Sequence, residues 1–301
     1  MNQLDLPAGL SHRPLTMADV PAVVAVMAAH ELAAVGEVVV DEADIVGDWS
    51  RPSFDLAAST VGVFDGDALL GYAEVAGTGR GDACVHPDQE GRGIGTALAR
   101  WMQDTARAQG QSEIGMPVPE GSAGERLLQA LGYRVRWNSW VLRFPADHAI
   151  AEQPLPPGYR LEIATDADVE AVYHVVEDAF LEWSRRAKQT LADWSAQVVG
   201  RPGHEPWNLQ LVRDPGGAVV GGVHVVLDHD GTGFVNKVAV RADQRGLGLA
   251  RALLAAAFAS ARAVGGGPSE LSTDSRTGAL DLYLGLGMEI YSTWVNYGID
   301  L

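Results

Sequence analysis

Residues 238–258 read VAVRADQRGLGLARALLAAAF and combine three features in a fixed order. The apolar run at 238–240 suits a buried strand. A glycine-rich, basic turn follows at 244–250, and the Ala/Leu-rich stretch after it predicts a helix over about 251–261. Glycines let successive backbone N–H groups approach an anion closely, and a helix N-terminus adds unpaired amides and positive dipole charge. The stretch therefore predicts a phosphate-binding strand, turn and helix.

The same pattern occurs earlier in the chain, at residues 84–102 (CVHPDQEGRGIGTALARWM). Gly93 aligns with Gly248, and Gly95 aligns with Ala250. Matching phrases follow each turn, LGY at 131–133 and LGM at 286–288. A repeat of about half the chain predicts two copies of one fold.

The later turn resembles the acetyl-CoA-binding signature of the GNAT acyltransferases, Arg/Gln-x-x-Gly-x-Gly/Ala, with Arg245, Gly248 and Ala250 at its fixed positions. A tight structural connection and a dinucleotide-binding turn are the alternatives, although Arg251 stands where the third dinucleotide glycine belongs. Signature and repeat together imply an α/β protein of the α+β kind. The resemblance implies two tandem GNAT folds, each a mixed, mostly antiparallel twisted sheet flanked by helices.

The length of 301 residues fits two domains of ordinary size. We expect an N-terminal domain at 1–147, a proline-rich linker at 148–158 and a C-terminal domain at 159–301. Prolines and a glycine at 154–158 break any periodic pattern there.

The net charge of −17 and the pI near 4.7 argue against nucleic acid as a partner, because binding it needs a basic face. An acidic surface keeps a protein soluble, and it also attracts cationic amines. The single cysteine, Cys84, excludes an internal disulfide and suits a reducing compartment. No apolar run looks long enough to span a bilayer. We expect a cytoplasmic protein without metal or membrane partner, a monomer or a homodimer.

The resemblance places the chemistry in the second half. In many GNAT enzymes, a tyrosine four residues before the glycine of the Leu-Gly phrase protonates the departing thiolate. Counting back from Gly287 gives Tyr283, whereas Gly132 gives Leu128, which has no transferable proton. A tyrosine with its ordinary pKa near 10 is a proton donor at neutral pH. Packing is the alternative role for Tyr283, and the first half is expected to be catalytically degenerate.

A general base is needed because the attacking amine must be neutral. His224, on the strand before the central one, has a suitable pKa range. A hydrogen-bonded strand residue is the alternative reading of this histidine. The other candidates are His229, Asp228, Asp230, Glu177 and Glu182, and water can also carry the proton.

The resemblance implies that acetyl-CoA is held by the central strand and by the turns. In the first half Glu90 stands where the signature has Arg or Gln, bringing a carboxylate near the pyrophosphate. The expected cofactor-binding residues are Val238, Ala239, Val240, Arg245, Gly246, Leu247, Gly248, Leu249, Ala250 and Arg251 in the second half, and Val85, Gly91, Arg92, Gly93, Ile94 and Gly95 in the first.

These features predict an N-acetyltransferase that moves an acetyl group from acetyl-CoA directly to a primary amine of a small molecule in a ternary complex. A non-catalytic acyl-CoA sensor or partner-binding module is the alternative from another class. Among enzymes, the alternatives are an antibiotic-modifying acyltransferase and one similar to mycothiol synthases, which share the tandem arrangement and acetylate a cysteinyl aminosugar conjugate. Those enzymes carry an acidic substrate contact four residues before the central-strand triplet, where this chain has Phe234.

Overall fold

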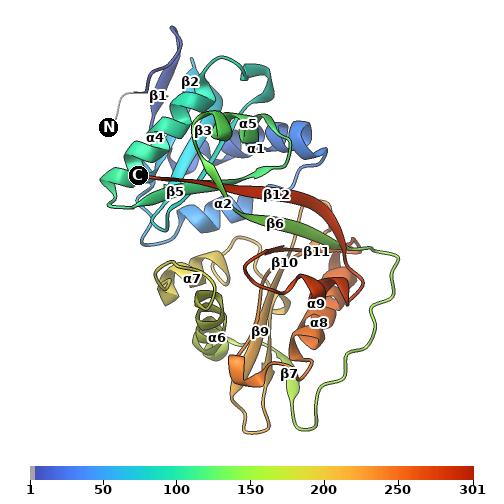
Figure 1. Cartoon of the computed structure of the whole chain (residues 1–301). Coiled ribbons are helices and arrows are strands. Elements are labelled where there is room, and N and C mark those ends of the chain that lie inside the picture. The colour runs from blue at the N-terminus through green and yellow to red at the C-terminus, as the bar shows by residue number, and fades with distance from the viewer. Residues whose placement is uncertain (1–3) are drawn as a thin grey trace. The chain divides into compact units, whose positions relative to one another are not determined.

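The computed structural model describes residues 4–301, which divide into two compact units (Figure 1). Of the described residues, unit 1 comprises 4–139 and Ser292–Leu301, and unit 2 comprises Trp140–Tyr291. Two long strands, β6 (Arg134–Phe144) and β12 (Glu289–Asp300), cross from one unit to the other.

Unit 1 is a mostly antiparallel sheet with helices on both faces. Its strands follow the order β1-β2-β3-β4-β5-β12, and β4 and β5 form a parallel pair. One core cluster lies under α4 and α5, and another lies under α1 and α2. The elements are β1 (Ser11–Arg13), α1 (Val20–Val35), α2 (Glu42–Trp49), α3 (Leu56–Ser59), β2 (Thr60–Asp65), β3 (Ala68–Ala76), β4 (Arg80–Val85), α4 (Ile94–Ala108), β5 (Glu113–Pro119) and α5 (Ala123–Ala130).

Unit 2 repeats this architecture. Its strands follow the order β6-β11-β10-β9-β8-β7, with β10 parallel to β11 and antiparallel to β9. The core cluster on one face includes α8 and α9, and the cluster on the other face includes α6 and α7. The elements are β7 (Arg160–Ile163), α6 (Val169–Leu181), α7 (Leu191–Gln197), β8 (Leu209–Arg213), β9 (Val219–Leu227), β10 (Gly233–Val240), α8 (Leu249–Gly265), β11 (Ser269–Asp274) and α9 (Leu280–Leu284).

The last strand belongs largely to the first unit. Residues 294–300 of β12 pair antiparallel with β5, and Figure 1 shows this red strand beside β5. Val295 and Tyr297 are buried in the unit 1 core, and the Tyr297 hydroxyl donates to Glu125 on α5 at 2.8 Å. The C-terminal residues Ser292–Leu301 therefore belong to unit 1, whereas the expected domain at 159–301 included them in the second half.

We expect Gly115→Val on β5 to lower the free energy of unfolding by about 1–3 kcal/mol, the usual cost of overpacking. A Cβ on Gly115 would lie 2.4 Å from the backbone carbonyl oxygen of Tyr297, so β5 and β12 must separate locally. Denaturant unfolding measures the loss. Gly77→Val is the matched control, because no atom lies within 4 Å of its Cβ position. Equal stability of the two variants would contradict the prediction.

Local signals in the sequence match the elements closely. Thr16 and Asp19 form a capping box before α1, and the side chain of Asp41 caps α2 by accepting a hydrogen bond from the backbone of Ala43. The Asp-Gly-Asp turn at residues 65–67 joins β2 and β3 in a hairpin. The apolar pattern at 277–286 suits a longer helix than α9, which covers only Leu280–Leu284 because Gly278, with a φ of 66°, precedes it.

The segment Met17–Val35 corrects one expectation. It is 19 residues long and apolar enough to cross a membrane by length and composition alone. This is weak evidence for a span, since core helices of soluble proteins pass the same test. In unit 1, Val20, Val23 and Val26 of this helix are buried in a core cluster.

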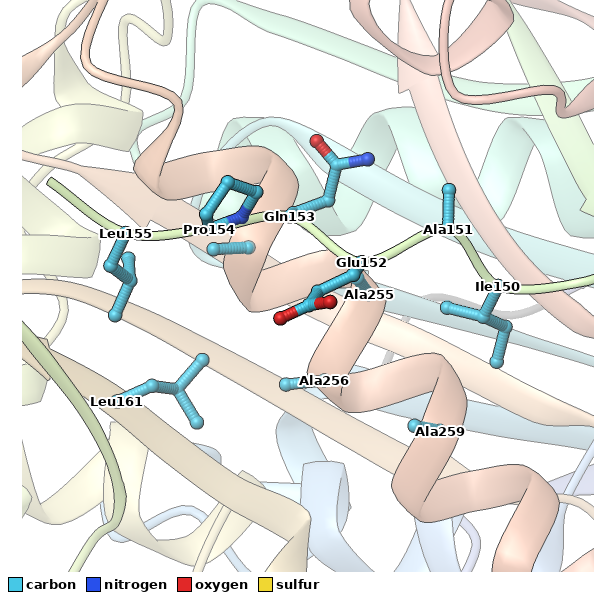
Figure 2. A pocket seen from close by; sticks show the side chains of 11 residues that line it. Ile150, Ala151, Glu152, Gln153, Pro154, Leu155, Leu161, Ala255, Ala256 and Ala259 are labelled. Atoms are coloured by element: carbon cyan, nitrogen blue, oxygen red, sulfur yellow. The ribbon is translucent and has the colours of Figure 1, made fainter.

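The segment after β6 lies along α8 (Figure 2). Residues 150–155 run over Ala255, Ala256 and Ala259 and bound a groove of about 460 Å³. Arg262 donates hydrogen bonds to the carbonyls of Pro145 and His148, which fixes the beginning of this segment on the helix. None of the candidate site residues lines the groove.

Candidate functional site

The turn before α8 has the geometry that the sequence predicts. Gly246 and Gly248 have φ angles of 77° and 81°, and Gly248 is the N-cap of α8. No atom lies within 4 Å of the Cβ position of either glycine, so their backbone faces open space. Leu249 is buried and anchors the helix to the core, whereas Leu247 is 42% exposed. The α8 amides at this turn form an open cradle that suits an anion.

Arg245 is held by an acidic partner that sequence reasoning did not pair with it. Its guanidinium donates two hydrogen bonds of 2.7 Å to Glu182, which follows α6, and Nε donates to the carbonyl of Val240 at 3.3 Å. The guanidinium lowers the pKa of Glu182. Arg245 therefore fixes the turn against the end of β10. Arg251, in the first turn of α8, lies close to Gly285, where an added Cβ would meet its guanidinium at 3.0 Å.

The central strand β10 opens along one edge. It pairs with β11 only over Gly233–Val235, although β11 continues to Asp274. Asn236 is an extra residue between Val235 and Lys237 in the register with β9, which is the pattern of a β-bulge. Val238, Ala239 and Val240 therefore do not pair with β11. The polar residues Asn236 and Lys237 interrupt the apolar pattern of this strand at the bulge.

Tyr283 and Leu128 occupy equivalent positions. Their carbonyls accept hydrogen bonds from Met288 and Tyr133 at 3.2 and 3.0 Å, and glycines of φ 91° and 85° close the two loops. Tyr283 is 7% exposed, and burial raises its pKa to about 12. Its hydroxyl has no hydrogen-bond partner within residues 4–301. The phenol is thus a protonated donor at neutral pH, and Leu128 offers the first unit no such group.

The turn of unit 1 has the same backbone geometry with different side chains. Gly91 and Gly93 have φ angles of 74° and 88°, and Gly93 is the N-cap of α4. Arg92 donates a hydrogen bond to Gln89. The strand β4 pairs with β5 at Arg80 only, so it also has an open edge that reaches Val85. Its register with β3 is unbroken, so the bulge belongs to unit 2 alone.

Comparison with known proteins agrees with this geometry. The model of the acetyltransferase (GNAT) family matches residues 169–288, and that of the FR47-like proteins matches residues 62–141. A mycothiol acetyltransferase from Salinispora arenicola is 32% identical over 255 residues, covering 79% of this chain and 80% of the relative. The chain belongs to the GNAT acetyltransferase family. It is an acyltransferase, and this family uses acyl-CoA.

Two solved structures support the tandem architecture. A GCN5-related N-acetyltransferase from Sphaerobacter thermophilus has a TM-score of 0.75 and 26% identity, covering 98% of this chain and 96% of its own. A tandem GNAT protein from the clavulanic acid biosynthesis pathway has a TM-score of 0.74 and 18% identity, and the match covers 97% of this chain and 98% of that protein. Each half of the chain is therefore a GNAT fold.

His224 lies on β9, deep in the sheet of unit 2. It is 1% exposed, and neither ring nitrogen has a hydrogen-bond partner within residues 4–301. Burial, and then the charges of Lys237, His204 and Arg201, lower its pKa well below the ordinary value. The imidazole is therefore neutral at pH 7 but a weaker base than an exposed histidine. Of the other base candidates, Glu177 accepts two hydrogen bonds from Arg186, and Glu182 is bound to Arg245.

Unit 1 carries carboxylates on the corresponding strands. Burial, and then the charge of Asp82, raise the pKa of Glu74 to about 7, although the indole of Trp49 donates a 2.8 Å hydrogen bond to it. The pKa of a glutamate in an unfolded chain is about 4.3. Between about pH 4.3 and about pH 7, Glu74 therefore binds a proton in the folded protein that it does not bind in the unfolded chain. The protonated carboxyl stabilises the fold fully below about pH 4.3, and this contribution is lost as the pH rises through about 7.

We therefore expect Glu74→Gln to remove part of the fall in unfolding free energy between about pH 5 and about pH 8. Denaturant unfolding at four pH values across this range measures the slope for the wild type and the variant. Glu120→Gln, at an exposed position, is the control. An unchanged slope in Glu74→Gln would show that Glu74 ionises normally in the folded protein.

Proposed function

We propose that unit 2 transfers an acetyl group from acetyl-CoA directly to a primary amine of a small molecule, within a ternary complex. Unit 1 serves as a degenerate scaffold or regulatory half. This assignment explains why the two units share the turn and the open strand edge but differ at the bulge and at Tyr283. That coincidence of turn, bulged open strand and buried phenol in one unit carries the proposal.

Different residues of unit 2 suit different parts of acetyl-CoA. The backbone amides of residues 246–251 suit the pyrophosphate of acetyl-CoA, since their glycines leave the cradle open. The unpaired edge of Val238, Ala239 and Val240 suits the pantetheine arm, which binds as another strand would. Acetyl-CoA supplies the activated acetyl group as a thioester. Backbone donors near the bulge at Asn236 are suited to polarise the thioester carbonyl.

The chemistry then needs one bond made and one broken. The neutral amine attacks the thioester carbonyl, a C–N bond forms, and the C–S bond breaks. Tyr283 gives its phenolic proton to the departing thiolate. The amine loses a proton to a base, for which we keep His224 as a candidate, or to water. Holding both substrates together in one site supplies much of the rate enhancement.

The test measures acetyl transfer to a panel of primary amines through the release of the free CoA thiol. We expect turnover with at least one amine and formation of the N-acetyl product by mass spectrometry. Binding of acetyl-CoA without turnover on any amine would favour the sensor. Absence of binding would remove the acetyltransferase assignment for this chain.

A second candidate acceptor is the precursor of mycothiol. The relative at 32% identity is named a mycothiol acetyltransferase, and this observation favours it. At the position of the acidic contact of mycothiol synthases, β10 carries Phe234, which offers no charge to an acceptor ammonium. We expect the mycothiol precursor to turn over more slowly than the best amine in the panel.

A further inference from the structure

The residues that follow α6 make two contacts between the faces of the unit 2 sheet. The carboxylate of Glu182 accepts two hydrogen bonds of 2.7 Å from Arg245, in the turn before α8. The ring of the next residue, Trp183, lies under the guanidinium of Arg276, whose Cζ is 4.9 Å from the ring centroid. The α6 helix lies on one face of the sheet, whereas α8 and α9 lie on the other (Figure 1). Both contacts therefore pass around the ends of the strands.

The strand ends that these contacts connect belong to β10 and β11. Arg245 donates a further hydrogen bond of 3.3 Å to the carbonyl of Val240, the last residue of β10. Arg276 donates hydrogen bonds to the carboxylate of Asp274, the last residue of β11. The two strands pair with each other only at their beginnings. The segment after α6 therefore links the two strand ends where β10 and β11 no longer pair.

Unit 1 has different residues at the four positions that make these contacts. Counting from the aligned glycines, and from the threonines of the two capping boxes, gives the equivalent positions in the repeat. They hold small or acidic residues: Ala33 and Ala34 at the end of α1, Glu90 in the turn and Gly121 after β5. The link is therefore not a requirement of the fold, because it occurs only in the unit that also carries the bulge and the buried phenol.

The ion pair between Glu182 and Arg245 competes with the binding of an anion at the turn. The amides at the start of α8 suit a pyrophosphate, and a guanidinium in the same turn suits it as a counterion. Glu182 neutralises this guanidinium and brings a carboxylate to the edge of the cradle. The side chains of Arg245 and Glu182 are 48% and 43% exposed, and exposed ion pairs contribute little free energy. A pyrophosphate is therefore able to displace Glu182 from Arg245.

We propose that Glu182 and Trp183, with their partners Arg245 and Arg276, form a latch that acetyl-CoA opens. The pyrophosphate takes the guanidinium of Arg245 from Glu182, and the pantetheine arm, entering beside β10, separates Trp183 from Arg276. The cofactor-free protein holds the latch closed, so the need to open it lowers the apparent affinity for acetyl-CoA. This inference rests on the proposed binding of acetyl-CoA by unit 2 and adds an autoinhibitory contact to it.

Calorimetric titration of acetyl-CoA into variants of the latch tests the inference. Glu182→Gln removes the charge that holds Arg245, and we expect it to tighten binding at the unit 2 site by roughly two- to fivefold, the equivalent of an exposed ion pair. Asp178→Asn is the matched control, because it removes the same charge from an exposed ion pair that α6 makes with Lys188. Its affinity should stay at the wild-type level. Binding by Glu182→Gln that is no tighter than binding by Asp178→Asn would overturn the latch.

A double variant separates the latch from simple charge repulsion between Glu182 and the cofactor. In Arg245→Met the carboxylate has no guanidinium to hold, so adding Glu182→Gln should leave the affinity of that variant unchanged. A gain of the same size with and without Arg245 would mean that Glu182 repels the cofactor through space. That result would overturn the latch.

The contact between Trp183 and Arg276 has an optical readout. Acetyl-CoA should change the tryptophan fluorescence of the wild type, because the guanidinium leaves the indole ring. Trp183→Phe should remove most of this change. An equal change in the two proteins would show that this contact stays closed and would overturn its part in the latch.

The same titrations distinguish failure of the latch from failure of the proposed function. Binding of acetyl-CoA to the wild type without a gain in Glu182→Gln overturns the latch and leaves the acetyltransferase assignment intact. Absence of acetyl-CoA binding to the wild type and to every variant contradicts that assignment, and it overturns the latch as well because nothing opens it.

Discussion

Tyr283→Phe is expected to lower kcat by roughly 100-fold to 10,000-fold, the range for loss of a general acid. In the proposed mechanism the phenol is the proton donor, and Leu128 offers unit 1 no such group. The substitution removes one oxygen from a side chain that has no hydrogen-bond partner within residues 4–301. The affinity for acetyl-CoA should stay nearly unchanged, because the turn and the open strand edge remain. Steady-state kinetics and calorimetric titration measure the two effects separately.

The matched control is Tyr133→Phe, which removes the hydroxyl of a buried tyrosine in unit 1 that contacts Gln103. It should leave kcat within about twofold. Because burial raises the pKa of Tyr283 to about 12, no loss of activity below about pH 10 should come from its ionisation. Wild-type turnover in Tyr283→Phe would exclude the phenol as the acid.

Gly248→Trp is expected to weaken acetyl-CoA binding by unit 2 roughly 100-fold or more, a change of about 2.7 kcal/mol. The indole covers the amides of the cradle, and the backbone at a φ of 81° resists any residue with a Cβ. Calorimetric titration of wild type, Gly248→Trp and Gly93→Trp counts the sites. Two sites in the wild type and one in each variant would show that both units bind the cofactor.

One wild-type site that Gly248→Trp abolishes and Gly93→Trp preserves would make unit 1 a scaffold. Gly266→Trp is the control for strain, because Gly266 has a φ of 75° at the other end of α8, far from the cradle. Its stability loss should match that of Gly248→Trp while its affinity stays at the wild-type level. Equal affinity in Gly248→Trp and Gly266→Trp would remove this turn from the binding site.

Much of the fold could be predicted because its signals are local. The capping residue Thr16, the turn at residues 65–67 and the two glycine turns each fix a few backbone angles through nearby atoms. The apolar pattern at 277–286 is longer than α9, because Gly278, with a φ of 66°, keeps the helix from beginning before Leu280. The start of a helix beside a glycine is therefore less certain than its start at a capping residue.

A residue of the candidate site could be predicted from the sequence where the repeat defines its position. Counting from the repeated glycines found Tyr283 and Leu128, and the structure places them at equivalent backbone positions. The partner of Arg245 was not predictable, because Glu182 is 63 residues away in the sequence. The same holds for the missing partners of His224, since an unsatisfied nitrogen is visible only when all neighbours are known.

The sequence by itself determined the duplication, the two phosphate-type turns and the asymmetry between Tyr283 and Leu128, because these are patterns of residue type at fixed spacing. Only the tertiary structure decided that β12 completes the first unit, that β10 bulges and parts from β11, and that Glu182 and Trp183 contact the segments after both strands. Strand pairing joins residues far apart in the chain, and its register depends on the whole packed sheet rather than on any local signal.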